Sequence, residues 1–88
     1  MYKIKDGFIV RKIGKQFMAV PVGSRTSDVH GMIALSESGA LLWSALETGA
    51  DTEALVAVLT ENYEVEPSVA VGDVESFIDG LKKQGALE

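Results

Sequence analysis

Several residue types that carry chemistry are missing or scarce in this sequence. The chain contains no cysteine, so it cannot form a disulfide, a thiolate metal site or a cysteine nucleophile. Its one histidine, His30, is not part of a recognisable nucleophile or paired-carboxylate constellation in the sequence. A single imidazole without cysteine partners is a poor basis for a metal centre. We therefore predict that the protein is not an enzyme and has no catalytic site, metal site or cofactor.

Positive charge is also scarce, because the chain has 8 Lys and Arg residues against 13 Asp and Glu residues, for a net charge of -5. Nucleic-acid binding needs clustered cations to contact the phosphates, so we expect no nucleic-acid partner. No apolar run approaches the roughly 18 residues that a membrane span needs. The N-terminal sequence MYKIKDGF lacks the apolar core of a signal peptide. We expect a cytoplasmic protein without membrane contact.

What is present is an ordinary globular composition. Hydrophobic residues make up 47% of the 88 residues and charged residues 24%, which argues against disorder. This length supports one modest hydrophobic core. We predict that residues 1–88 form a single domain.

Three strands are predicted in the first 35 residues. Phe8–Ile13 is β-branched and loosely alternating, and the turn candidate Gly14-Lys15 joins it to a second strand at 16–22. A polar loop follows. Residues 29–35 read as a third strand, with Gly31 inside it as a mark of a bulge or a close backbone approach.

Three helices are predicted in the rest of the chain. Ser36 is the N-cap of the first, which spans 36–49 with a glycine at its C-terminal end. The second begins at position 51 or 52 and ends near position 63. Pro67 suits the first position of the third, which spans 67–84. The order β-β-β-α-α-α predicts an α+β, winged-helix-like fold, in which a three-stranded antiparallel sheet precedes three helices.

Two parts of these helices are expected in the core. Trp43, the only tryptophan, is expected to pack between the first helix and the sheet. The apolar residues of the third helix recur with helical spacing. They predict a core stripe of Val71, Val74, Phe77, Ile78 and Leu81.

Three segments in this order resemble the PqqD family (pyrroloquinoline-quinone biosynthesis protein D). They are Leu35-Ser36-Glu37-Ser38-Gly39-Ala40-Leu41-Leu42-Trp43, Thr52-Glu53-Ala54-Leu55 and Gly85-Ala86-Leu87. Ser36 and Ser38 depart from the usual Asn and Thr of the family pattern, although Ser36 can still cap a helix. The family includes the leader-peptide recognition elements of enzymes that modify ribosomally made peptides. The resemblance implies the same winged-helix-like fold and a role in peptide binding.

The candidate binding site combines a strand edge and a helix face. Residues 29–34 carry none of the Lys or Glu side chains that protect strand edges, and an extended peptide can add to such an edge. On the third helix, small residues recur every four positions, including Ser76 and Gly80, which can permit close approach of another backbone. The resemblance implies that the leader peptide lies as an added strand in this groove. The predicted site residues are Val29, His30, Gly31, Met32, Ile33, Ala34, Val69, Asp73, Ser76, Phe77 and Gly80.

Two functions of different classes follow from this reading. In the first, the chain binds the leader segment of a precursor peptide and presents it to a modifying enzyme, for which a radical-SAM protein is the expected class. In the second, it is a structural or regulatory adaptor that uses the sheet edge for assembly or to form a homodimer. A DNA-binding winged helix is disfavoured because the polar side of the third helix carries Asp73, Glu75 and Asp79.

Overall fold

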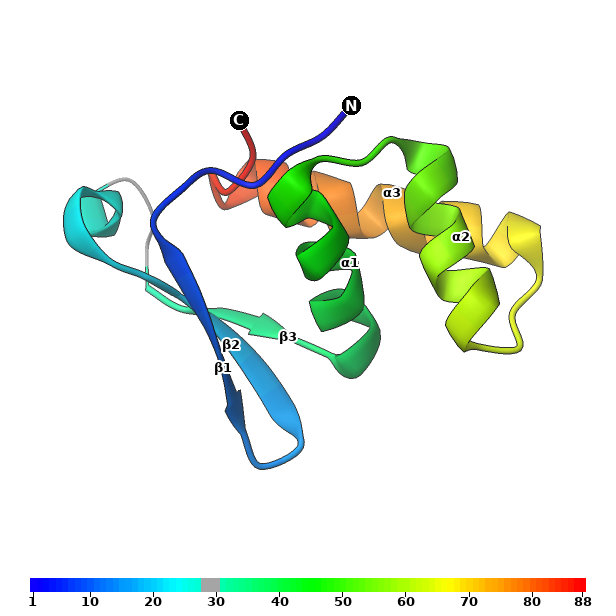
Figure 1. The fold of residues 1–88 in the computed structure, drawn as a ribbon, viewed down its shortest axis with the longest axis horizontal. Helices are drawn as coiled ribbons and strands as arrows, with labels where there is room; N and C mark the ends of the chain where they lie inside the picture. Colours follow the sequence, from blue (N-terminus) through cyan, green and yellow to red (C-terminus); the bar gives the residue numbers. More distant parts are fainter. Residues whose placement is uncertain (28–30) are drawn as a thin grey trace.

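The computed structural model describes residues 1–27 and 31–88 of the chain. The predicted order of three strands followed by three helices is confirmed, with one short 3-10 helix between the second and third strands (Figure 1). The elements are β1 (Phe8–Ile13), β2 (Gln16–Pro21), η1 (Gly23–Ser27), β3 (Ile33–Leu35), α1 (Glu37–Thr48), α2 (Thr52–Asn62) and α3 (Pro67–Lys83).

The sheet is antiparallel, and β2 lies at its centre between β1 and β3. The predicted hairpin turn is confirmed, because Ile13 pairs with Gln16 across it. Gly14 in this turn has a φ of +64°, a conformation that glycine adopts at low cost. Since β2 is central, β1 and β3 are the two edge strands of the sheet.

The third strand is shorter than the predicted 29–35. It comprises Ile33–Leu35 only. Gly31 has a φ of +76°, which interrupts extended backbone, so the strand begins after it and Met32 also lies outside it. The part of the prediction that falls on Val29 and His30 lies outside the described residues.

The helix boundaries follow from local capping chemistry, as predicted. The Gly39 amide donates to Ser36 Oγ at 3.0 Å, which satisfies one free N–H of the first turn of α1. Asp51 caps α2 in the same way through the Ala54 amide, at 2.8 Å. Pro67 is the first residue of α3, where its missing N–H has no consequence.

The hydrophobic core joins the sheet to all three helices. Trp43 is 1% exposed, which confirms its predicted burial, and the Phe8 ring meets it edge-on with centroids 5.2 Å apart. The predicted core stripe of α3 is wrong at Val71, which is 37% exposed, while Ala70 is fully buried. Each residue turns the helix by roughly 100°, so the buried face centred on Val74 takes in Ala70 and leaves Val71 at its margin.

The two ends of the chain lie together, which the sequence did not predict (Figure 1). Tyr2 exchanges two backbone hydrogen bonds with Ala50, at 2.7 and 2.9 Å. The Lys5 amide donates to the Ala86 carbonyl, and the Glu88 amide donates to the Lys3 carbonyl, both at 2.9 Å. The N-terminal segment therefore ties the α1–α2 connection to the C-terminal tail. Within the described ranges, none of the helices has the length and apolar character of a membrane span.

Candidate functional site

The joint between β3 and α1 is packed tightly against α3. Gly39 lies in the first turn of α1 and is buried. A Cβ at this position would lie 3.2 Å from Ser36 Oγ and 3.3 Å from Phe77 Cε1, closer than most side-chain contacts. The absence of a side chain at Gly39 therefore lets α3 bring Phe77 against the first turn of α1.

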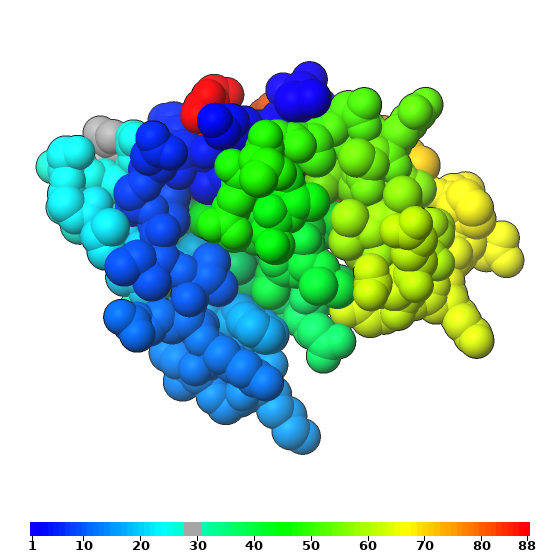
Figure 2. Space-filling view, viewed as in Figure 1, coloured from blue at the N-terminus to red at the C-terminus, as the bar shows by residue number. Residues whose placement is uncertain are grey.

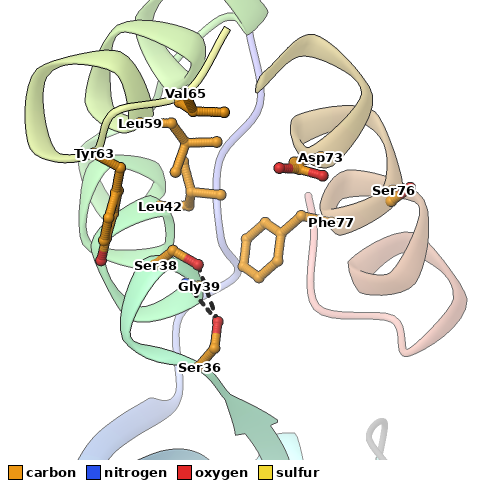
Figure 3. Close-up of a pocket in the computed structure, with 10 residues that line it drawn as sticks. All are labelled: Ser36, Ser38, Gly39, Leu42, Leu59, Tyr63, Val65, Asp73, Ser76 and Phe77. Atoms are coloured by element: carbon orange, nitrogen blue, oxygen red, sulfur yellow. Dashed lines mark hydrogen bonds between the residues drawn. The ribbon is translucent and has the colours of Figure 1, made fainter. Parts of the chain in front are cut away.

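A pocket of about 490 Å³ opens beside this joint. Figure 3 shows that the start of α1 and the exit of α2 form one wall, and that α3 forms the other. The lining residues are Ser36, Ser38, Gly39, Leu42, Leu59, Tyr63, Val65, Asp73, Ser76 and Phe77.

The lining combines an apolar interior with a few polar groups. Leu42 and Leu59 are buried core residues, and Phe77 is half-buried with its ring pointing between the two walls (Figure 3). Asp73 is exposed and directs its carboxylate toward the opposite wall. Pockets of this kind hold an apolar group, and their polar groups fix its orientation. The arrangement suits a bulky apolar side chain of a ligand, with polar or cationic residues next to it in that ligand.

One side-chain hydrogen bond joins α2 to α1 near the pocket. The Tyr63 hydroxyl donates to Glu37 Oε1 at 3.2 Å, between residues far apart in the sequence. Desolvation and this bond to a carboxylate raise the pKa of Tyr63 above its ordinary value, because both disfavour the phenolate. When Tyr63 is neutral, this bond therefore connects the C-terminal end of α2 to the start of α1.

The edge of β3 that faces away from β2 pairs with no strand among the described residues. Ile33 and Leu35 bury their side chains in the core, and Ala34 between them is exposed. The strand is thus held in place by its side chains while its outer backbone stays open. An edge of this type can accept an extended peptide as an additional strand.

The predicted residues near β3 fall into three groups. Ile33 and Ala34 lie in the strand. Gly31 and Met32 precede it and are exposed, Met32 by 57%. Val29 and His30 are outside the described residues, so the structure does not place them.

The predicted residues of α3 are brought only partly together. Asp73, Ser76 and Phe77 line the pocket. Val69 is 52% exposed and does not line it. Gly80 lies one turn beyond Ser76, and a Cβ placed there would meet nothing within 4 Å. The flank of α3 that carries Gly80 is therefore open.

Sequence reasoning missed the other wall of the pocket, which comes from residues of α1, α2 and the segment after α2. The spacing of Ser36 and Gly39 was a usable signal, since a cap followed by a glycine marks a place where another element approaches. Leu59, Tyr63 and Val65 gave no such signal, because only the packing of α2 against α3 brings them to the pocket. In residues 1–27 and 31–88, no three His, Cys, Asp or Glu side chains are grouped to hold a metal ion.

Comparisons with known proteins give a family match and a structural match. The family described as "Coenzyme PQQ synthesis protein D (PqqD)" matches residues 11–87. A solved structure described as "TbiB1 in Complex with the TbiA(beta) Leader Peptide" has the same fold, with a TM-score of 0.76 and 24% sequence identity over 98% of this chain and 94% of that one. No curated protein sequence matches the chain. Since the family match spans most of its length, this chain belongs to the PqqD family.

Proposed function

We propose that this protein binds the leader segment of a ribosomally made precursor peptide and presents it to a modifying enzyme. The observation that carries the proposal is the open edge of β3 beside a pocket lined by α3. Family membership supports it, as does the similarity to TbiB1, a protein solved with a leader peptide. The family assignment favours this function over the adaptor function.

In this proposal the two parts of the site do different work. Backbone pairing along β3 sets the register of the peptide without reading its side chains. The pocket takes one apolar side chain, and Asp73 selects for a cation near it. Val69 and Gly80 extend the groove along α3, while Gly31 and Met32 extend it before the strand.

The modifying enzyme, the location and the domain organisation belong to the same proposal. A radical-SAM enzyme is the proposed partner class, and the peptide is made and modified in the cytoplasm. Residues 1–88 act as a single non-catalytic domain. A homodimer through the β3 edge would compete with the peptide for the same backbone groups, so self-association is measured alongside binding.

The test is a titration of the cognate leader peptide against the wild type and Gly80→Leu. A leucine at Gly80 fits the open space within the chain and raises helix propensity by about 1 kcal/mol, so folding is retained while the groove is obstructed. Gly72→Leu is the matched control. Its position is equally open, and eight residues rotate it by roughly 80° from Gly80 around the helix.

We expect the affinity for the leader peptide to fall with Gly80→Leu and to stay near the wild-type value with Gly72→Leu. Amide shifts in NMR spectra of the wild type should map to Ile33–Leu35 and to α3. Shifts confined to the Gly14 turn and α2, with β3 and α3 unaffected, would contradict the proposal.

A further inference from the structure

The outer face of the hairpin is a second surface with the properties of an interface. Directly paired residues of antiparallel strands project from the same face of a sheet. Ile9 pairs with Val20 and Arg11 pairs with Met18, whereas the intervening Ala19 is fully buried on the inner face. Gln16 pairs with Ile13 and lies on the same side. We call the set of Ile9, Arg11, Ile13, Gln16, Met18 and Val20 the outer hairpin face.

This face is largely apolar, and its β1 side chains are exposed in the described part of the chain. Ile9 is 43% exposed and Ile13 is 62% exposed. Polar side chains at these two positions would not disturb the core, so the core does not account for the isoleucines. The helices pack against the opposite face, where Phe8 meets Trp43. Figure 2 shows the hairpin projecting beyond the helices. Exposed apolar rows around a central arginine are typical of protein interfaces.

The charge around this face differs from that of the helices. Residues 8–22 contain Arg11, Lys12 and Lys15 and no carboxylate. Residues 37–83 contain ten carboxylates and two lysines. Within the described residues Arg11 and Lys15 form no ion pair, so both charges are available to a partner. The complementary surface is an apolar patch bordered by carboxylates.

We propose that the outer hairpin face docks the peptide-modifying enzyme through such an acidic-bordered apolar patch. The choice of this occupant rests on the proposed function, because an enzyme must meet the bound peptide. β1 is the edge strand opposite β3, so a partner on Ile9 and Ile13 leaves the β3 edge free for the peptide. Both surfaces can therefore be occupied at once.

Two other occupants fit less well. A second copy docked through the same face would form a two-fold contact that brings two sets of cations, Arg11 and Lys15, together. Nucleic acid or an anionic membrane would need more cations than the three of residues 8–22. Charge complementarity therefore favours a protein with surface carboxylates.

The probe is a purified enzyme of the proposed radical-SAM class, chosen because it modifies the peptide whose leader the wild type binds. Its affinity is measured for the wild type, Arg11→Glu and Ile13→Ser, at low and at high salt. Lys83→Glu makes the same charge change at the end of α3, and Val71→Ser removes an exposed apolar side chain from α3, so these are the matched controls. The cognate leader peptide is titrated against every variant.

We expect Arg11→Glu and Ile13→Ser each to weaken enzyme binding roughly tenfold, while both controls and the leader-peptide affinity stay unchanged. High salt should weaken the wild-type complex and have less effect on Arg11→Glu. Enzyme binding that is absent, or unchanged by both hairpin variants, would overturn the proposal. A leader affinity that fails in the wild type would instead count against the groove.

The competing occupants are tested with the chain alone. In sedimentation, the wild type should form no dimer that depends on Arg11. The wild type should also not bind vesicles of phosphatidylcholine with phosphatidylglycerol. A dimer through this face, or vesicle binding lost in Arg11→Glu, would overturn the assignment to the enzyme. Circular dichroism of each variant verifies that the fold is retained.

Discussion

The hairpin and the helical part of this molecule are built in opposite ways. The helical part is acidic and is hollowed by the pocket. Side-chain caps fix the starts of α1 and α2, and the Tyr63–Glu37 bond ties these two helices together. The hairpin is basic, buries Ala19 on its inner face and leaves its outer face open. The contact of Phe8 with Trp43 joins the two parts.

This difference separates two tasks on one small chain. A peptide site needs walls of fixed shape, and the helical part provides them through packing between distant residues. A docking surface needs exposed side chains on a rigid support, and a paired hairpin provides that support. A substitution at the contact between the two parts should therefore damage both, whereas a substitution within either part should damage one.

Trp43→Ala should have the largest effect, because it removes the side chain that holds the hairpin to α1. We expect a loss of about 3–5 kcal/mol in the free energy of unfolding, as for other large aromatic truncations in cores. That loss approaches the whole stability of a domain this small. Urea unfolding followed by circular dichroism measures it. A native fluorescence spectrum typical of water-exposed tryptophan would contradict the burial.

Gly39→Val should damage the helical part alone. Its side chain would press on Phe77 and Ser36, and overpacking of this kind costs about 1–3 kcal/mol. Urea unfolding of Gly39→Val, Phe77→Ala and the double variant tests the cause. We expect the double variant to lose less stability than the sum of the two single variants, because the clash disappears with the ring. Additive losses would place the strain elsewhere.

The elements were predictable from the sequence because their signals are local. Ser36 and Asp51 cap helices by accepting hydrogen bonds from amides three residues away. Gly14 forms the hairpin turn through its own positive φ. The pairing of Tyr2 with Ala50 was not predictable in this way, since it joins residues distant in sequence and leaves no local pattern.

The candidate site was predictable only on one side. The small-residue spacing and the family resemblance pointed to the third helix without giving its flank, and the structure places Asp73 and Phe77 of α3 at the pocket. The facing wall depends on how α2 packs, which spacing cannot give. Spacing also wrongly placed Val71 in the core. Val71 precedes Val74 by three residues, and this spacing fits a residue at the margin of a buried helix face as well as one at its centre.

Ile13→Ser should leave stability almost unchanged, in contrast to both changes above. The side chain is 62% exposed, and surface substitutions of this kind are usually within about 0.5 kcal/mol of the wild type. Urea unfolding provides the measurement, and Ile33→Ala, at a 3% exposed position of the same sheet, is the control with a large expected loss of about 2–5 kcal/mol. A comparable loss for Ile13→Ser would mean that the outer hairpin face is structural.

Tyr63→Phe should have the smallest effect on the free energy of unfolding, and this effect should depend on pH. Desolvation and the bond to Glu37 raise the pKa of Tyr63 in the folded chain, so the neutral phenol is favoured by folding. The stabilisation is fully present below the unfolded pKa of roughly 10 and is lost as pH rises through the higher folded value. Absorbance titration of the phenolates, with Tyr63→Phe to assign them and Glu37→Gln to remove the carboxylate, measures the shift. We expect the folded Tyr63 to ionise at higher pH than in urea, and Glu37→Gln to reduce that difference. A Tyr63 that ionises at the same pH in both states would show that the α1–α2 tie does not form in solution, and the helical part would then be held by packing alone.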